Sequence, residues 1–211
     1  TDSTFAAPST LRTMRTPTLR ACSLFSGRFE RADGLAAILK RFGWASVDEF
    51  DNDSESGGGW QSDLMNDEVY SRILSACTTG YYDAIHIAFP CSTFSISRLF
   101  NKDGTLKKSG DPITAKSGPP PIRSHEFPDG LPDDQLDIRY VKELRYCNLL
   151  FERTVNIAVA ARNSSKKTTI CWEYPADRSN KGTCAYSPSM ADLGAACVCN
   201  TKAFKRLLDS I

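Results

Sequence analysis

The sequence lacks a long hydrophobic run, since no apolar stretch approaches the roughly 18 residues that a membrane-spanning helix requires. It also lacks an excess of charge. Its 26 Lys and Arg residues and 25 Asp and Glu residues give a formal net charge of +1, so overall charge does not by itself indicate a nucleic-acid partner. The remaining composition, 41% hydrophobic and 24% charged, is typical of a globular protein.

Paired cysteine spacings are absent too. The eight cysteines are spread without a C-x-x-C motif, which favours reduced thiols in an intracellular compartment over a disulfide framework. Cys184, Cys197 and Cys199 form the closest cluster, but their spacing fits no common zinc-ligand pattern, so we expect no metal site. Histidine is scarce. His86 and His125 belong to no evident Ser-His-Asp arrangement, and His86 is expected to be a hydrogen-bonded residue of the core.

Short apolar strands alternate with amphipathic helices along the chain, which predicts an α/β fold with a mostly parallel sheet and helices on both faces. Residues 1–17 are predicted to form a flexible N-terminal arm, and residues 18–211 a single domain. Within that domain, a long loop is expected at about residues 98–133. Strands are expected at about 19–25, 44–47, 82–89 and 168–172, and helices at about 32–42, after 66, at 134–161 and at 201–208.

Local signals define the first helix in more detail. Leu35, Ile38, Leu39 and Phe42 recur at helical spacing, which predicts that these four side chains face the core. Gly43 is placed to end this helix, because glycine readily adopts the left-handed conformation found after helix ends. The first helix therefore has both a predicted buried face and a predicted end.

Residues 82–97 read YDAIHIAFPCSTFSIS and contain the most informative pattern. An apolar strand comes first, and Pro90 ends it because proline cannot donate to a sheet ladder. Cys91 then lies at the carboxyl end of a core strand, where open α/β sheets place ligands and chemistry. A cysteine there is either a reactive thiol in a cleft or, as free cysteines usually are, a buried and inert side chain.

Other strand ends also carry residues suited to binding or chemistry. Gly27 lets a ligand approach the backbone. Glu49 lies where Rossmann-like sheets bind a ribose diol, and Phe50 beside it is placed to stack on an adenine; the alternative is a surface acid next to a core Phe. Glu173 ends a buried strand, where it is either an acid/base partner for a thiol or part of a capped turn.

Basic residues gather in the loop that follows Cys91. They are Arg98, Lys102, Lys107, Lys108, Lys116 and Arg123. Two interpretations remain open, a solvated surface and a phosphate-contacting rim around the cleft.

Five short motifs, in this order, resemble those of the DNA (cytosine-5) methyltransferase family. They are LFSG at 24–27, EFD at 49–51, DL at 63–64, FPCSTFSIS at 89–97 and WEYP at 172–175. The FPCSTFSIS stretch is the close match, and the five together cover about residues 19–175. The resemblance implies a Rossmann-like S-adenosylmethionine-dependent methyltransferase fold. The cofactor-binding residues that it implies are Phe25, Ser26, Gly27, Glu49, Phe50, Asp63 and Leu64.

The resemblance also implies a reaction, methyl transfer to C5 of cytosine in DNA, with RNA as a less favoured acceptor. Cys91, preceded by Pro90, attacks C6 of the base while Glu173 interacts with N3, which makes C5 nucleophilic. The base leaves the stack to reach such a site, and the loop after Cys91 closes over it. The residues assigned to nucleic-acid contact are Ser92, Ser95, Arg98 and Arg123.

Some features of the family are not found. These are further glycines directly after Gly27, a Gln-x-Arg-x-Arg motif, and a target-recognition domain or closing helix after Ser187. Their absence keeps two alternatives open: a catalytically silent domain of this fold that binds nucleic acid or a protein partner, and a methyltransferase with another acceptor. A partner chain or a missing segment would supply target recognition. We expect an intracellular, reducing location, and the nucleus if the organism is eukaryotic.

Overall fold

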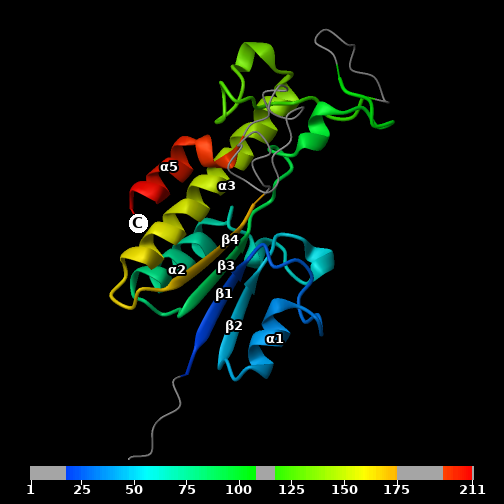
Figure 1. Cartoon of the computed structure of the whole chain (residues 1–211). Coiled ribbons are helices and arrows are strands. Elements are labelled where there is room, and N and C mark those ends of the chain that lie inside the picture. The colour runs from blue at the N-terminus through cyan, green and yellow to red at the C-terminus, as the bar shows by residue number, and fades with distance from the viewer. Residues whose placement is uncertain (1–17, 108–116, 175–196, 211) are drawn as a thin grey trace, which may run out of the picture.

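The computed structural model describes residues 18–107, 117–174 and 197–210, and of Ile96 only the backbone (Figure 1). The predicted N-terminal arm, residues 1–17, lies outside these ranges. None of the helices in the described ranges combines the length and the apolar character needed to cross a bilayer.

In the part of the chain that the structure describes, four parallel strands form the sheet. They are β1 (Arg20–Leu24), β2 (Ser46–Phe50), β3 (Ala84–Ala88) and β4 (Thr169–Glu173), in the order β2-β1-β3-β4. The helices are α1 (Leu35–Arg41), α2 (Asp67–Thr78), α3 (Ile138–Asn163) and α5 (Lys202–Asp209). The predicted α/β class and the parallel sheet are confirmed, although β2 starts and ends later than expected and includes Glu49 and Phe50.

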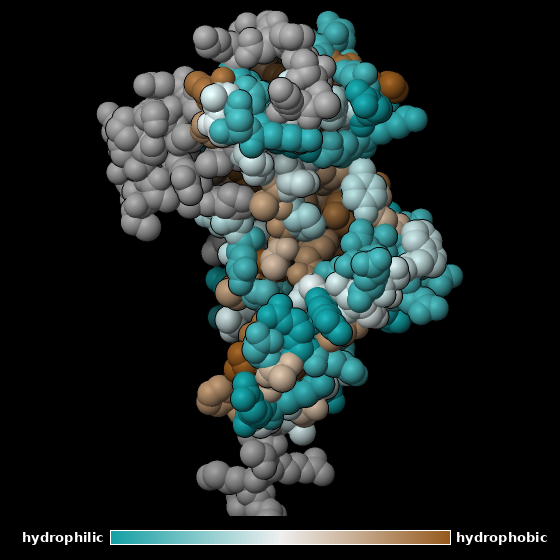
Figure 2. Space-filling view, turned by 90° about the vertical axis from the view of Figure 1, so that its right-hand side faces the viewer, coloured by the Kyte–Doolittle hydropathy of each residue, from teal (hydrophilic) through white to brown (hydrophobic). Residues whose placement is uncertain are grey.

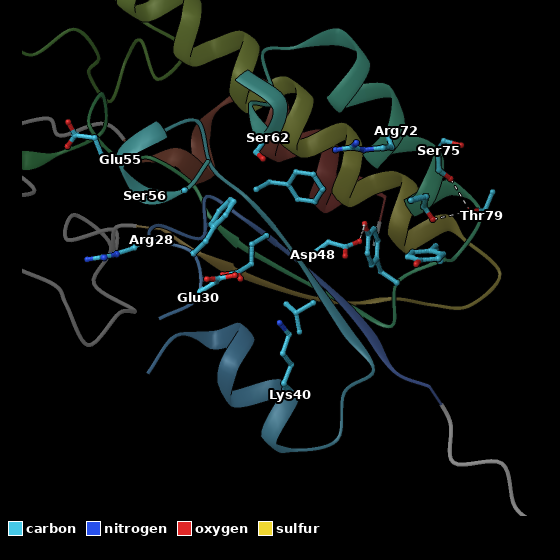
Figure 3. A pocket seen from close by; sticks show the side chains of 18 residues that line it. Arg28, Glu30, Lys40, Asp48, Glu55, Ser56, Ser62, Arg72, Ser75 and Thr79 are labelled. Atoms are coloured by element: carbon cyan, nitrogen blue, oxygen red, sulfur yellow. Dashed lines mark hydrogen bonds between the residues drawn. The ribbon is translucent and has the colours of Figure 1, made fainter. Parts of the chain in front are cut away.

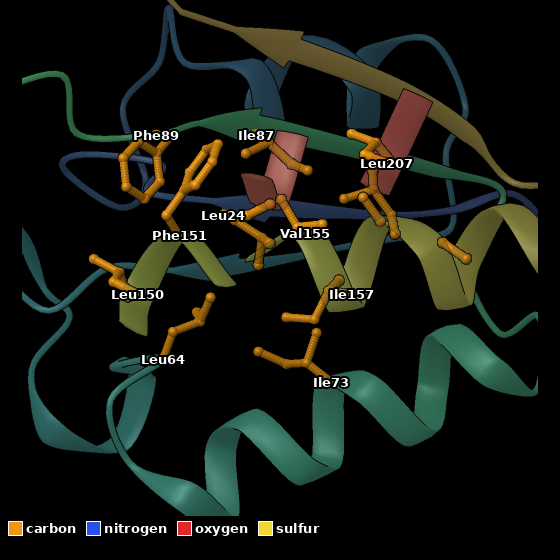
Figure 4. Close-up of a cluster of buried hydrophobic side chains, with 14 of the residues drawn as sticks. Leu24, Leu64, Ile73, Ile87, Phe89, Leu150, Phe151, Val155, Ile157 and Leu207 are labelled. Carbon is orange, nitrogen blue, oxygen red and sulfur yellow. The ribbon is translucent and has the colours of Figure 1, made fainter. Parts of the chain in front are cut away.

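The sheet has helices on both faces, as predicted (Figure 1). Because successive strand residues point to opposite faces, Cys22 and Leu24 of β1 join the main core with α2, α3 and α5, whereas Ala21 packs with Ala36 of α1. Figure 4 shows this main core, in which side chains of the sheet meet Val155 of α3. Burial of this apolar surface is what holds the strands in register.

The direction in which the chain adds successive strands to the sheet reverses beside β1. From β1 the chain moves to β2 on one side and then crosses to β3 and β4 on the other, so the carboxyl ends of β1 and β3 flank a topological switch point. Phe25 and Phe89 follow these two strands, and their rings meet edge to face with centroids 5.5 Å apart. Phe25 has a φ of 59°, a left-handed conformation that aromatic residues rarely adopt and that concentrates at functional sites.

Capping residues explain where the helices begin and end. The Asn66 side chain accepts a hydrogen bond from the Glu68 N–H at 3.0 Å, and Asp137 accepts one from the Arg139 N–H at 2.9 Å. Such caps satisfy donors that the first helical turn leaves unpaired. Gly43, with a φ of 87°, follows the end of α1 as predicted.

The predicted buried face of α1 is wrong in part. Ala36 is the buried residue of this helix, while Leu35 is exposed and Phe42 is 80% exposed. The physical reason is the length of the helix: α1 ends at Arg41, so Phe42 is its C-cap residue and leaves the helical face. Leu39 alone of the predicted set packs against the small cluster under α1.

Candidate active site

Cys91 follows β3, one of the two strands whose carboxyl ends flank the switch point. Phe89 is buried, whereas Pro90 and Cys91 are exposed. The Cys91 carbonyl accepts a hydrogen bond from the Phe94 N–H at 2.9 Å, so residues 91–94 form a turn. Of the two interpretations left open by the sequence, the structure therefore favours an accessible thiol.

Two buried arginines hold the turn that carries Cys91. The Arg98 Nε donates to the Ser92 carbonyl at 2.7 Å, and the Arg123 Nε donates to the Thr93 hydroxyl at 3.2 Å. The Arg123 guanidinium also lies 4.1 Å from the centroid of the Phe94 ring, a cation–π contact. Each of the three residues after Cys91 is thus fixed by one of the two guanidinium groups.

The remaining guanidinium donors of these arginines are also occupied. Arg98 donates to the Pro120 carbonyl at 3.1 Å and pairs with the Glu143 carboxylate. Arg123 donates to the Pro128 carbonyl at 2.8 Å, and burial lowers its pKa. Because Arg98 is 5% exposed and Arg123 4% exposed, the structure gives both a supporting role, and direct contact with nucleic acid stays a prediction.

The two described parts of the predicted 98–133 loop, residues 98–107 and 117–133, are joined by hydrogen bonds. Lys107 donates to the Arg98 carbonyl at 2.9 Å and to the Pro119 carbonyl at 2.5 Å, and burial lowers its pKa. Ile122 is fully buried, and its carbonyl accepts from the Leu131 N–H at 3.0 Å. The base of this loop is therefore fixed. Residues 108–116, with the predicted basic residues Lys108 and Lys116, lie outside the described ranges.

The other two predicted nucleic-acid contacts lie in the fixed turn and the short helical turn after it. Ser92 is exposed, while Ser95 is half-buried and shares a hydrogen bond of 2.8 Å with the Ser97 hydroxyl. Ser95 also caps the turn at Ile96–Leu99, since its hydroxyl accepts from the Ser97 N–H at 3.2 Å. Ser92 is therefore the more accessible of the two for a ligand.

Glu173 is the last residue of β4, and β4 is the neighbour of β3, the strand that Cys91 follows. Its parallel partner in β3 is Ala88, three residues before Cys91, so the carboxylate and the thiol come from adjacent strand ends. The Glu173 Oε1 lies 2.9 Å from the His86 Nε2, and the His86 Nδ1 lies 3.2 Å from the Ser23 hydroxyl. The sequence predicted that His86 would be hydrogen-bonded, but it did not identify either partner.

The loop after β1 is tied to the end of β2. The Ser26 N–H donates to the Phe50 carbonyl at 3.2 Å, and the Gly27 N–H donates to an Asp51 carboxylate oxygen at 2.9 Å. Gly27 has a φ of 68°, and a Cβ there would meet no atom within 4 Å. Glycine is therefore favoured at this position by its backbone conformation, while the space beside it is open.

A cavity of about 1160 Å³ opens beside β2, between α1 and α2 (Figure 3). Two predicted cofactor residues, Glu49 and Phe50, line it together with Arg28 and Arg72, and Arg72 was not predicted from the sequence to belong to a site. Phe50 is also buried in the main core, with the Arg72 guanidinium 5.7 Å from its ring centroid. The cavity lining contains neither Cys91 nor Glu173, nor residues 25–27 or 63–64.

A hydrogen bond at the cavity wall fixes Tyr82. Its hydroxyl donates to the Asp48 carboxylate at 2.7 Å, and burial above all raises the pKa of Tyr82. The phenol therefore stays protonated and acts as a donor.

The predicted residues Asp63 and Leu64 take part in the protein's own packing. Asp63 accepts from the Met65 N–H at 2.8 Å, and the Leu64 side chain is buried in the main core (Figure 4). The Leu64 carbonyl accepts from Arg153 at 2.8 Å. Their contact with a cofactor stays a prediction.

Figure 2 views the molecule from the side of β2 and shows a hollow with hydrophobic surface. The hollow separates the upper part, which contains the loop after β3, from the lower part, which contains β2 and α1. It therefore lies near the carboxyl edge of the sheet, where the turn after β3 and the loop after β1 also lie.

No metal-binding group of three or more His, Cys, Asp or Glu residues occurs among the described residues. Cys184, which belongs to the cluster considered above, lies outside them. No family model matches the sequence, and searches of curated proteins and of solved structures found no match. The functional interpretation therefore depends on the residues and their geometry.

The burial of the thiols predicts their reactivity. At pH 8, iodoacetamide should modify the exposed Cys91 and Cys171 of the native protein while Cys22 and Cys77 stay protected. Burial raises the pKa of Cys77 to about 12, so its thiolate is scarce at this pH. Peptide mass spectrometry measures the modification, and equal labelling of all four thiols before unfolding would contradict the assigned burial.

The guanidinium of Arg98 should be required for a stable Cys91 turn. Arg98→Met keeps the aliphatic stem but leaves the Ser92 and Pro120 carbonyls without their donor, and should lower the free energy of unfolding by about 2 kcal/mol. It should also speed hydrogen exchange at residues 92–94. Arg145→Met is the matched control, because Arg145 is 72% exposed and its ion pair with Asp133 lies at the surface.

Urea denaturation measures the first effect and hydrogen-exchange mass spectrometry the second. The supporting role of Arg98 is wrong if the two variants are equally stable and exchange at equal rates.

Proposed function

We propose that this protein transfers a methyl group from S-adenosylmethionine to C5 of cytosine in DNA through a covalent adduct of Cys91. The observation that carries the proposal is the pairing of an exposed thiol with a carboxylate at neighbouring strand ends. Cys91 follows β3, Glu173 ends β4, and the register of these strands brings both to one edge of the sheet. This arrangement accounts for why the close FPCSTFSIS match coincides with the end of a strand.

The chemistry needs both groups because C5 of cytosine is a poor nucleophile. Attack of the Cys91 thiolate on C6 breaks the aromaticity of the ring, while Glu173 in its protonated form donates its proton to N3, where negative charge would otherwise develop. Electron density then reaches C5, which takes the methyl group. Loss of the C5 proton to a base and departure of the Cys91 thiolate restore the aromatic ring, so the enzyme is regenerated.

The residues at the end of β2 fit an adenosine-containing cofactor. Glu49 lines a cavity of about 1160 Å³, which is large enough for such a molecule, and its carboxylate can accept hydrogen bonds from ribose hydroxyls. S-adenosylmethionine supplies an electrophilic methyl group when bound. Glu49 would bind its ribose, and the loop at Phe25, Ser26 and Gly27 would border it near the switch point.

The exposure of the site suits a base that has left the DNA stack. The Glu173 side chain is 67% exposed, so N3 of an extruded cytosine can reach its carboxylate. Ser92, exposed beside Cys91, is placed to contact the same nucleotide. A partner chain or a missing segment would supply target recognition, and RNA is the alternative acceptor.

A specific observation favours a second candidate function, a catalytically silent domain that binds nucleic acid or a protein. Phe50 and Leu64 are buried in the core, and Asp63 accepts from the Met65 N–H. Three of the residues assigned to the cofactor are thus partly or wholly used by the protein itself.

Trapping the covalent adduct tests the proposal against this second candidate. The protein is incubated with S-adenosylmethionine and a DNA duplex that carries 5-fluorocytosine in many sequence contexts. A fluorine at C5 cannot be eliminated as a proton would be, so the Cys91 adduct should persist as a shifted band on a denaturing gel. Cys91→Ala should abolish the band.

Cys171→Ala is the matched control, because Cys171 is also exposed and lies on β4, yet it has no assigned role. This variant should keep the adduct. A folded wild-type protein that binds the cofactor and forms no adduct would favour the silent domain. An adduct with 5-fluorocytosine RNA but not with DNA would reassign the acceptor.

A further inference from the structure

We infer that His86, held in place by Ser23, positions the Glu173 carboxylate for the proposed reaction. This inference rests on the proposed function, and it concerns two residues that none of the family motifs contains. Ser23, His86 and Glu173 come from three adjoining strands, β1, β3 and β4. They form a continuous hydrogen-bonded chain that ends at the proposed catalytic carboxylate.

The parallel register explains why these three side chains meet. Ser23 pairs with His86 across β1 and β3, and His86 pairs with Cys171 across β3 and β4. Glu173 lies two residues beyond Cys171 and therefore on the same face, diagonal to His86. The distances agree with this placement, at 3.2 Å from Ser23 Oγ to His86 Nδ1 and 2.9 Å from His86 Nε2 to Glu173 Oε1.

The chemistry of the three groups orients their hydrogen bonds. Whether Glu173 is ionised or carries its proton on Oε2, the Oε1 atom only accepts, so the His86 Nε2 must carry the proton that faces Glu173. In a neutral imidazole the Nδ1 is then an acceptor, and the Ser23 hydroxyl donates to it. Ser23 is 2% exposed, so water does not compete freely for its hydroxyl. The buried serine thus selects the tautomer that donates to Glu173.

This chain restrains a carboxylate that would otherwise be mobile. Glutamate has several rotatable bonds, and the Glu173 side chain is 67% exposed, so unrestrained it would sample many rotamers. His86, whose side chain is 19% exposed, holds Oε1 and leaves Oε2 to carry the proton that we assign to N3 of the base. Fixing one rotamer before the substrate arrives lowers the entropic cost of reaching the transition state.

The histidine comes from the interior of the strand that leads to Cys91. His86 is five residues before Cys91 on the same backbone, in the middle of β3. The strand therefore sets the position of the thiol at its end and, through His86, that of the carboxylate on its neighbour. His86 acts through Glu173, so it is a positioning residue.

Two substitutions separate the hydrogen bond from the packing of His86. His86→Leu preserves bulk but removes the donor, and should lower the single-turnover rate of methyl transfer about 10- to 100-fold, the cost expected of a misplaced catalytic group. The dissociation constant for S-adenosylmethionine should not change. His86→Gln offers an amide donor in place of Nε2 and should recover part of the rate.

A double-mutant cycle distinguishes positioning from general support of the fold. In a Glu173→Gln background the carboxylate is absent, so His86→Leu should cause little further loss of rate. The inference is overturned if His86→Leu lowers the rate by the same factor in both backgrounds, or if it has no effect on the wild-type rate.

A spectroscopic measurement tests the chain independently of activity. At pH 8, ¹⁵N NMR of the imidazole should show the proton on Nε2 in the wild-type protein, and Ser23→Ala should weaken this preference. A proton on Nδ1 instead would overturn the inference even if methyl transfer occurs. The expected tautomer in a protein that forms no adduct would show that the proposed reaction, rather than the contact, has failed.

Discussion

The parallel register of β1, β3 and β4 is the constraint on which the rest of the structure depends. Parallel strands end at one edge of a sheet, so Phe25, Cys91 and Glu173 are brought together although they lie far apart in sequence. The same register aligns Ser23, His86 and Glu173 on one face. A slip of one residue would turn His86 into the main core and break both arrangements.

The two groups to which we assign the reaction are held by different means. Cys91 is exposed, but buried arginines fix the three residues after it through carbonyl, hydroxyl and aromatic contacts. Glu173 is exposed at the end of β4, and a histidine from the neighbouring strand fixes its carboxylate. Both groups therefore combine an accessible side chain with a restrained position, as a preorganised site requires.

Local patterns predicted much of the fold. The α/β class, the parallel sheet, a helix after residue 66 and the position of Cys91 after β3 followed from hydrophobic runs and the Pro90 strand break. The exposed position of Phe42 did not follow, because it depends on where α1 ends. Sequence periodicity gives element type, but it does not fix a short helix's last residue.

The contacts that support the site could not be predicted from the sequence. They depend on the order of the strands in the sheet and on where the loop after β3 folds back onto the protein. Nothing in the sequence near Arg98 indicates that the Pro120 carbonyl comes back to meet it. The partnership of His86 with Glu173 likewise requires that β3 and β4 be neighbours, although they are separated by the whole of α3. Strand geometry alone places His86 on the opposite face from Ile85 and Ile87, but it does not identify a partner.

The central claim is that Cys91 directs a methyl group to C5 of cytosine, and the most direct measurement identifies the product. DNA is incubated with the protein and S-adenosylmethionine that carries a deuterated methyl group, then digested to nucleosides for mass spectrometry. The account predicts deuterated 5-methylcytosine with the wild-type protein and none with Cys91→Ala. A deuterated base other than 5-methylcytosine, or equal product from both proteins, would contradict it.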